Sequence, residues 1–564
     1  MADVANVSFL STQEGTVPFK ALVLAPLGGL TIPEKLVDPV EINLHNFDKV
    51  IKTFAPVIEV AVDNNALCEL LNVSNQTLTL RYAIEAYADF EPSAIVQKDP
   101  ALFEISNTIS ALHSLLEKND DQFITSDIVL KSISIPSWDH QSASRQQLEI
   151  LICDLESVLG EVLNQILHQH NWQQLEAAWR GLYWLCDTAK ISDGLTIECG
   201  TATKALLWDD LLSSADLVDS NLYQHVYVDS IGQFGAVPYG VLLIDDYFTG
   251  TGSDLSLLKA LTNVCSRAHL PIITAASSSM FNADDFNSLQ NSSFISDIHS
   301  GASFIKWRSF IASEDASYLT LTLPRLLFRK VYDKGGTSLT WFQEYVGGRH
   351  QECLWGNASY GFVDNLFKSF EDSSFCSAIS GSNGGKIDIS ALISSQTGLP
   401  VEVAFSGEKE AELIGLGFNP VCTRAYQNQL LFESANSVRW GNMKLNHKTQ
   451  TVDSIASAQL QYLLVVVRII HCLKIIFRES LGATMHVSEL SNILNRWVRQ
   501  FVSDVEAPSL TVRSQRPLKD AQVTVLEALD VGWFDIDISL TPHMKYLGNS
   551  VAISASVPMK EEVA

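Results

Sequence analysis

Residues 171–182, NWQQLEAAWRGL, are the stretch of this sequence that says most about the fold. Glu176 and Arg180 stand four residues apart, a spacing at which opposite charges on an α-helix can pair. The apolar residues recur at steps of three and four, which places them on one face of a helix. They are Leu175, Ala178, Trp179 and Leu182. The stretch therefore predicts a helix with a buried tryptophan face, as many folds contain.

The sequence on either side predicts further helices and strands. A long helix is expected from Gln147, because apolar residues recur at helical spacing as far as Ile166. Strands and helices then alternate to about residue 400, and a helical pair follows at 454–502. The remaining segments alternate with period two, as strands with one buried face do. They are residues 521–528, 533–540 and 550–558.

The N-terminal part reads as a smaller unit. PFKALVLAPLGG at 18–29 predicts a strand that ends in a glycine turn, and residues 103–118 carry a helical apolar stripe. Residues 119–146 mix polar and turn-forming residues without a period, which is typical of a connector. We expect an α/β protein of mixed α+β character. Its expected parts are a small α/β unit at 1–118, a linker at 119–146, a large multi-subdomain core at 147–505 and a β-rich C-terminal region with a strand arm at 506–564.

Composition excludes several classes of function. The 564 residues carry 64 acidic against 38 basic side chains, a formal net charge of −26, without any run rich in lysine or arginine. Nucleic acid and anionic lipid are therefore not expected as partners. The nine cysteines are an odd number and contain no Cys-x-x-Cys pair, so neither a disulfide framework nor a zinc site is indicated. A reducing bacterial cytoplasm is the expected location.

Neither a secretory signal nor a membrane span is expected. The N-terminal MADVANVSFLSTQEG has no basic segment ahead of an apolar run. The most apolar stretch, 460–476, is interrupted by Arg468, His471 and Lys474, and it falls short of the about 20 apolar residues that a spanning helix needs. It predicts a buried core helix. Together with Arg478 its cations form a row for which ion pairs, within the chain or between subunits, are the expected use.

No residue can be assigned a catalytic role. The glycines at 381–385 lack a following Gly-Lys-Ser/Thr, so they predict a tight turn and no phosphate loop. Asp245 and Asp246 follow an apolar run without a partner motif for a metal, and solvation at a strand end is expected for them. The serines at 277–279 lack the Gly-x-Ser-x-Gly elbow of hydrolases. We expect no enzyme, no cofactor and no metal.

A family resemblance emerges when the helix at 171–182 is taken together with later segments. The stretch resembles the LEaaWRGL signature of the large (TssC or VipB) sheath subunit of type VI secretion systems, and further motifs of that family follow in the same order. The matching segments are FGAVPYGVLLIDDYF at 234–248, RAHLPIITAASSSMF at 267–281, IKWRSFIASEDASYLTLTLPRLLFR at 305–329, LWGNASYGF at 354–362, ISGSNGG at 379–385, EVAFSGEKEAELIGLGFNPV at 402–421, VRIIHCLKIIFRESLG at 467–482 and LNRWVRQFV at 494–502. The resemblance covers about 147–560.

The chain departs from this family at two places. Ser317 stands where the family has arginine, and FRKVYD at 328–333 lacks the family's proline. The resemblance implies structural or assembly roles for the residues that carry its motifs. They are Leu175, Glu176, Trp179, Arg180, Trp307, Pro324, Arg325, Trp355, Gly356, Asn357, Arg468, His471, Lys474, Arg478 and Trp497.

The N-terminal unit separately resembles the small (TssB or VipA) sheath subunit. The motifs are PFKALVLAPLGG at 18–29, INLHNFDKVIKTFAP at 42–56 and YADFEPSAIVQKDPALFEI at 87–105. The resemblance implies that two normally separate chains are encoded as one, with a fold like that of contractile phage tail sheaths.

The resemblance implies a structural subunit that polymerises around an inner tube and contracts to propel it. Implied partners are further copies of the chain, the inner tube protein, baseplate components and a sheath-recycling AAA+ ATPase. Because the ATPase-binding segment of relatives would be internal here, near 119–146, its recognition is expected to be altered. The resemblance also implies terminal arms that add strands to a neighbour's sheet, for which residues 6–10 and 550–557 are suited.

Two alternatives remain at this point. One is a soluble α/β enzyme or metabolite-binding protein without a recognisable catalytic motif. The other is an accessory relative of the sheath that is deficient in assembly. The strands at 6–10 and 550–557 have their own alternative, since each could be an ordinary edge strand of its own domain.

Overall fold

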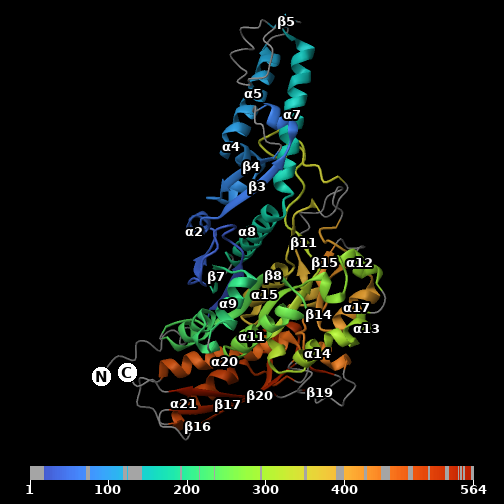
Figure 1. The fold of residues 1–564 in the computed structure, drawn as a ribbon. Helices are drawn as coiled ribbons and strands as arrows, with labels where there is room; N and C mark the ends of the chain where they lie inside the picture. Colours follow the sequence, from blue (N-terminus) through green and yellow to red (C-terminus); the bar gives the residue numbers. More distant parts are fainter. Residues whose placement is uncertain are drawn as a thin grey trace, which may run out of the picture.

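The computed structural model describes most of residues 18–560 as an elongated molecule (Figure 1). A helical hairpin projects from one end, a large sheet lies in the middle, and a small sheet lies at the opposite end. The segments outside the description are 1–17, 71–76, 119–122, 125–142, 191–193, 215, 234, 293–294, 348–351, 389–398, 425–428, 446–457, 481–486, 506–507, 528–532, 544, 547–548, 551–552 and 561–564. The expected arm at 6–10 and nearly all of the expected linker at 119–146 therefore lie outside the described residues.

The central sheet has nine strands in the order β13-β15-β14-β10-β9-β8-β1-β7-β2. Its six inner strands from β14 to β7 are parallel, whereas β2, β13 and β15 pair antiparallel at the two margins. The strands are β1 Phe19–Ala25, β2 Val40–Ile42, β7 Leu195–Thr201, β8 Tyr239–Phe248, β9 Ile272–Ala276, β10 Leu319–Leu323, β13 Lys386–Ile387, β14 Phe418–Arg424 and β15 Gln429–Phe432. This confirms the α/β class.

Strand β1 comes from the N-terminal segment and lies in the middle of this sheet. It pairs in parallel with β7 on one side and with β8 on the other. Its residues from Ala21 to Ala25 are buried, which suits a strand covered on both faces. The expected unit at 1–118 is therefore not set apart from the large core, because β1 and β2 are strands of the core's own sheet.

The two faces of the sheet build two separate cores. Along β1, Ala21 and Val23 contribute to one core, while Leu22 and Leu24 contribute to the other, as the alternation of a strand requires. The first core includes residues of α8 His170–Ala189 and α15 Ser359–Ser373, among other helices. The second includes residues of α9 Lys204–Leu212, α11 Gly252–Arg267, α14 Ile305–Ile311 and α17 Gly407–Gly415, among others.

The projecting hairpin joins the N-terminal segment to the segment that follows the linker. Helix α5, Pro100–Lys118, packs beside α7, Arg145–Leu167, and both lie above the hairpin of β3, Val57–Asp63, and β4, Thr77–Ala83 (Figure 1). Both long helices were predicted from their apolar spacing. The remaining N-terminal elements are α2 Phe47–Phe54, α3 Asn65–Leu70, the short turn Tyr87–Phe90 and α4 Pro92–Lys98.

The C-terminal region forms a third core. Helix α20, Leu460–Ser480, packs with α21, Val487–Val498, and with an antiparallel sheet in the order β16-β17-β20. The strands are β16 Leu518–Glu527, β17 Trp533–Pro542 and β20 Ile553–Lys560. This confirms the predicted helical pair and strands. Residues 460–478 are long and apolar enough to cross a membrane, yet 94 % of that stretch is buried in the fold, as expected for a core helix.

Candidate functional site

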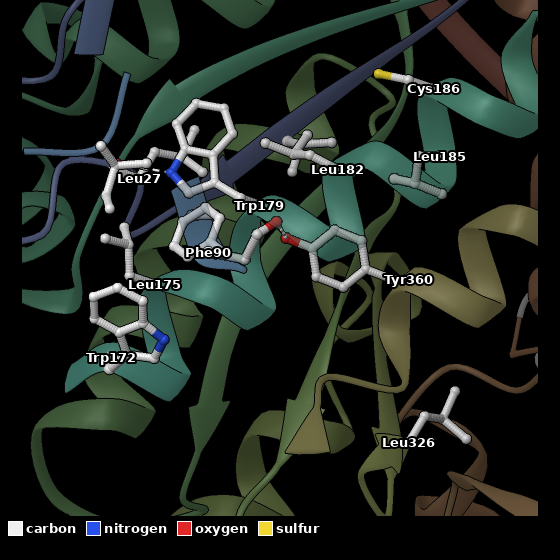
Figure 2. Close-up of a cluster of buried hydrophobic side chains, with 14 of the residues drawn as sticks. Leu27, Phe90, Trp172, Leu175, Trp179, Leu182, Leu185, Cys186, Leu326 and Tyr360 are labelled. Atoms are coloured by element: carbon white, nitrogen blue, oxygen red, sulfur yellow. Dashed lines mark hydrogen bonds between the residues drawn. The ribbon is translucent and has the colours of Figure 1, made fainter. Parts of the chain in front are cut away.

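The contact between α8 and the N-terminal segment is the most extensively built site in the molecule. Trp179 is fully buried, and its indole Nε1 donates a hydrogen bond to the carbonyl oxygen of Leu27 at 3.2 Å. Its ring meets those of Phe47 and Phe54 edge-on, with centroids 5.8 and 6.0 Å apart. Figure 2 shows Trp179 beside Leu27 and Phe90, with Leu175 below. We call this contact between residues 18–118 and α8 the seam.

A second aromatic contact extends the seam by about two turns of α8. Trp172 lies edge-on to Tyr82 and Phe90, with ring centroids 5.7 and 5.9 Å apart. Leu175 is buried between the two tryptophans along the helix (Figure 2). The prediction that α8 buries a tryptophan face is confirmed, and the structure shows that the N-terminal segment covers that face.

The glycine within the same helix allows a close approach by α15. A Cβ atom at Gly181 would lie 2.6 Å from the ring of Tyr360, nearer than real Cβ contacts come. Tyr360 is fully buried and its hydroxyl donates to the carboxylate of Asp245 at 3.1 Å. A larger residue at position 181 would therefore force α8 away from α15 and from the sheet.

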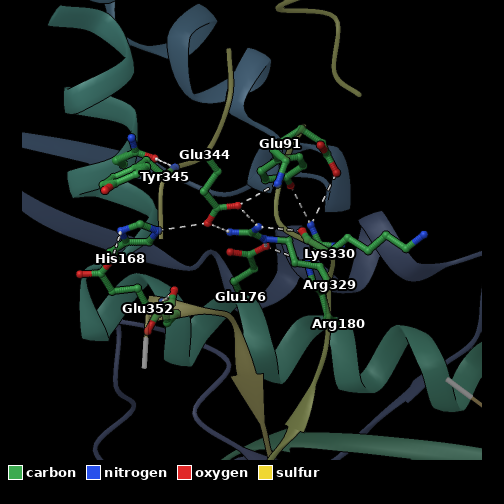
Figure 3. Close-up of polar contacts among 12 residues, drawn as sticks. Glu91, His168, Glu176, Arg180, Arg329, Lys330, Glu344, Tyr345 and Glu352 are labelled. Carbon is green, nitrogen blue, oxygen red and sulfur yellow. Dashed lines mark hydrogen bonds and ion pairs between the residues drawn. The ribbon is translucent and has the colours of Figure 1, made fainter. Parts of the chain in front are cut away.

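Buried charges lie next to the aromatic contact (Figure 3). Glu176 has a fully buried side chain and accepts from the Nε atoms of both Arg180, at 2.7 Å, and Arg329, at 2.9 Å. Arg329 also donates to Glu344 through Nη1 at 2.6 Å and Nη2 at 3.1 Å. His168 contacts Glu344 from the other side at 3.1 Å. The predicted Glu176–Arg180 pair is confirmed as one part of this larger charge network.

The charge network reaches into the N-terminal segment through Arg180. Its Nη1 donates to the hydroxyl of Tyr87 at 3.1 Å, and its Nη2 lies 3.5 Å from the carboxylate of Glu91. The same guanidinium lies over the ring of Tyr87, 5.4 Å from the centroid, in a cation–π contact. Arg180 therefore bonds to both sides of the seam.

Electrostatics keep this network ionised. Burial is the largest single influence on Glu344 and raises its pKa, but the charge of Arg329 and the hydrogen bonds from His168, Arg329 and Tyr332 together lower that pKa to about 2. Burial disfavours the charge of Arg329, yet Glu176 and Glu344 hold its pKa well above the ordinary value. Buried charges of this kind are tolerated only when each has its partners, so loss of one member leaves another uncompensated.

The middle group of predicted residues lies around the sheet. Trp307 of α14 is buried against Phe310, and Arg325 follows a cis Leu323–Pro324 bond and forms a bidentate pair with Glu402 at 2.7 and 2.8 Å. These contacts lie within the chain. An assembly role for Trp307, Pro324 and Arg325 stays a prediction.

Residues 355–357 hold three of the predicted site residues, in a short strand and the residue that follows it. Trp355 and Gly356 form β12, which pairs with β11, Leu326–Leu327. A Cβ atom at Gly356 would lie 2.3 Å from the ring of Phe328, so only glycine fits without movement. Asn357 caps the start of α15 by accepting from the N–H of Ser359 at 2.9 Å. An assembly role for these three residues also stays a prediction.

The cation row on α20 differs from the expectation. Arg468 donates to the carbonyl of Pro18 at 3.0 Å, and His471 contacts the carbonyl of Ala268 at 3.1 Å. Lys474 lies over a tyrosine ring, and burial lowers its pKa to about 8. Within the described residues the structure shows no ion pair inside the chain for Arg468, His471 and Lys474, and ion pairs between subunits stay a prediction.

Two further predicted site residues are Arg478, near the C-terminal end of α20, and Trp497, on α21. Arg478 donates to the carbonyls of Ile231 and Ala236 at 3.0 and 2.9 Å, so it ties α20 to the segment before β8. Trp497 packs its ring 4.9 Å from that of Phe501. Both contacts stay within the third core and its neighbours.

The expectation of solvation is wrong for Asp245. Strand β8 continues through Phe248, so Asp245 lies inside the strand and against Tyr360. Burial raises the pKa of this carboxyl to about 7, although hydrogen bonds from Tyr360 and Asn357 oppose the shift. In the described part of the chain, histidine, cysteine, aspartate and glutamate form no group of three that could hold a metal.

Sequence reasoning missed several residues of the charge network. They are His168, Arg329 and Glu344 in one segment and Tyr87 and Glu91 in the other. One signal was available, because Arg329 is the last residue of the segment at 305–329 that resembles the family. The pairing itself joins residues far apart along the chain, so no local pattern could have shown it.

Family models match almost the whole chain. The model described as EvpB/VC_A0108 tail sheath N-terminal domain matches residues 149–439, more than half of the chain. The tail sheath gpW/gp25-like domain model matches residues 449–558, and a type VI secretion VipA, VC_A0107 or Hcp2 model matches residues 10–136. The order agrees with the two resemblances found in the sequence.

One curated protein and one solved structure are also similar. The type VI secretion system sheath protein TssC1 of Pseudomonas aeruginosa is 29 % identical over 423 residues, which cover 72 % of this chain and 85 % of that protein. The crystal structure of the sheath tail protein Lin1278 from Listeria innocua matches with 11 % identity and a TM-score of 0.31. That match covers 61 % of each chain.

Proposed function

Since this chain belongs to the tail sheath family of type VI secretion systems and is a contractile sheath subunit, we propose that each copy is one complete protomer. It would hold the equivalent of one small and one large subunit. The chain would then need no separate partner to build the repeating unit of the sheath.

The position of β1 is the observation that carries this proposal. A strand from the small-subunit-like segment lies between β7 and β8 of the large-subunit-like segment. The seam and the charge network add side-chain contacts across the same boundary. Neither segment would have a complete sheet alone, so the two form one folded body.

Membership of the family implies self-assembly into a helical polymer. We propose that this polymer surrounds an inner tube, attaches to a baseplate and lies in the cytoplasm. Contraction would require two alternative packings of the same rigid protomer. The predicted site residues suit this role, since Trp179, Arg325 and Arg478 each tie separate elements of one protomer together.

The C-terminal strand suits assembly as the edge of a sheet. Strand β20 pairs with β17 of its own chain through residues 553–560. Strand addition from a second copy would extend this sheet through main-chain hydrogen bonds. We propose that the N-terminal segment of a neighbouring copy supplies that strand.

The proposal also concerns recycling of the sheath by an AAA+ ATPase. The segment that such an ATPase binds in relatives would correspond here to the region near 119–146, within the chain. A sheath that carries this segment internally should bind such an ATPase weakly or not at all. A pull-down that shows tight binding of the ATPase to this segment would contradict the expectation.

Electron microscopy of the purified chain tests the proposal. Hollow tubes or cogwheel rings are expected, and deletion of residues 1–10 should reduce their yield because the added strand is lost. An unchanged yield after the deletion would favour an assembly-deficient accessory relative. Persistent monomers whose melting temperature rises on binding a small molecule would favour the enzyme or metabolite-binding alternative.

A further inference from the structure

The C-terminal sheet has two edge strands, which differ in whether their outer main-chain groups already have hydrogen-bond partners. Strand β16 forms one edge and β20 the other, with β17 between them. An exposed edge offers unpaired N–H and C=O groups to any other strand, including strands of the wrong partner. Which edge can accept a strand therefore decides in which direction a sheet of this kind grows.

Asn495 occupies the outer edge of β16. The side chain of this residue, on α21, accepts a hydrogen bond from the N–H of Val523 at 2.9 Å and donates to the C=O of Val523 at 2.5 Å. A carboxamide carries an acceptor oxygen and a donor nitrogen on separate atoms, so it reproduces the pair of bonds that a neighbouring strand would form. Val523 thus has its outward main-chain groups satisfied from within the chain.

Two further contacts occupy the same edge. The C=O of Leu518 accepts from the N–H of Ser503 at 2.9 Å, beside a parallel bridge between Val502 and Leu518. The N–H of Ala521 donates to the carboxylate of Asp520 at 2.9 Å. Main-chain groups at Leu518, Ala521 and Val523 are therefore already bonded, and a strand arriving at this edge would have to displace them.

Strand β20 has no such cover among the described residues. It pairs with β17 on one side, and no other described strand pairs with its second side. The chain holds a further 17 residues ahead of Pro18, with the apolar run VSFL at 7–10. These residues are long enough to supply a strand to the sheet of another copy.

We propose that Asn495 locks the β16 edge, so that a second copy of this chain can extend the C-terminal sheet at β20 alone. This inference rests on the proposed function for the strand addition itself. The lock gives the contact between copies one direction, because a sheet that accepted strands at both edges could branch or pair with itself. Asn495 is therefore a positioning residue for assembly.

The first measurement concerns the lock itself in the full-length chain. Amide hydrogen exchange at Val523 should become about tenfold faster in Asn495→Leu, because the hydrogen bond that this N–H donates to Asn495 is lost and the bond that anchors the neighbouring C=O is lost with it. Asn495→Asp keeps the acceptor and loses the donor, so its exchange should be intermediate. Asn492→Leu is the matched control, since Asn492 is an exposed asparagine of the same helix and should leave exchange unchanged.

The second measurement concerns the direction of strand addition. A fluorescent peptide of residues 1–17 should bind the wild type and Asn492→Leu once per chain and protect the amides of β20. Asn495→Leu should bind a second peptide, at β16. Unchanged exchange at Val523 in Asn495→Leu, or peptide protection at β16 in the wild type, would overturn the lock. Faster exchange without any peptide binding would uphold the lock and contradict strand addition by this segment.

Discussion

The indole of Trp179 donates to the carbonyl of Leu27 across 152 positions of sequence, at 3.2 Å. Trp179 belongs to the large-subunit-like segment, and Leu27 directly follows β1 of the small-subunit-like segment. The bond fixes the end of a central strand to the helix that covers it. The two segments therefore share one core, whatever connects them.

Replacement of Trp179 tests the seam. Trp179→Phe removes the hydrogen bond to Leu27 and leaves a cavity, so we expect a loss of about 2 kcal/mol in the free energy of unfolding. Trp341→Phe is the control, because Trp341 is only partly buried and should cost less. Urea unfolding measures both variants. Equal losses would contradict a special role for Trp179.

Cleavage of the linker tests whether the two segments form one body. A protease site placed within residues 125–142 should allow complete cleavage without separation of the fragments. The reason is that β1 pairs with strands on both sides and the seam remains intact. Size-exclusion chromatography with light scattering gives the mass after cleavage. Separation into two independently eluting fragments would show that the covalent link is required.

Removal of Arg329 tests the charge network. Arg329→Met leaves Glu176 and Glu344 buried without their shared partner, and we expect a loss of about 3–5 kcal/mol. The exposed pair of Arg145 and Glu149 is the control, and Arg145→Met should cost about 0–1 kcal/mol.

The charge network also has a pH dependence of known sign. The pKa of Glu344 is lowered in the folded state, so its contribution is present above the ordinary value of 4.5 and is lost as pH falls toward 2. Unfolding measured between pH 5 and pH 2 should show this loss in the wild type. Glu344→Gln should show a smaller one, and identical profiles would contradict the assignment.

The partly buried carboxyl of Asp245 predicts the opposite pH dependence. Its pKa is raised from 3.8 to about 7 in the folded state, so stability falls as pH rises between these values. Asp245→Asn removes this cost and keeps an oxygen for Tyr360, so it should be more stable than the wild type at pH 8 by up to about 4 kcal/mol.

The difference between Asp245→Asn and the wild type should vanish near pH 4. Asp297→Asn provides the control, because Asp297 is exposed on the short helix α13, Ile295–Ser300, and should show little change at either pH. Melting temperatures across this range check the prediction. A difference that does not vary with pH would mean that Asp245 is ionised in the folded protein.

Local features of the fold could be predicted from sequence, and long-range pairings could not. Helices α7, α8 and α20 follow from apolar spacing within 20 or so residues, which is a local property. The central position of β1 depends on partners at 195–201 and 239–244, and nothing inside the β1 sequence specifies them. The pairing of β1 within the large sheet could not be predicted for this reason.

The same limit applies to the candidate site. Glu176–Arg180 was predictable because the two residues lie four apart on one helix. Arg329 and Glu344 join that pair only through the fold. The cations of α20 satisfy backbone carbonyls, and Asp245 is partly buried against Tyr360, because tertiary neighbours decide both environments.

A helical reconstruction from cryo-electron microscopy tests the central claim most directly. The purified chain, concentrated together with its cognate inner tube protein, should form hollow helical tubes. Each repeating unit should be one chain, with β1 between β7 and β8 and one added strand beside β20. Failure to form ordered polymers under these conditions, or a repeating unit that needs a second kind of sheath chain, would contradict the account.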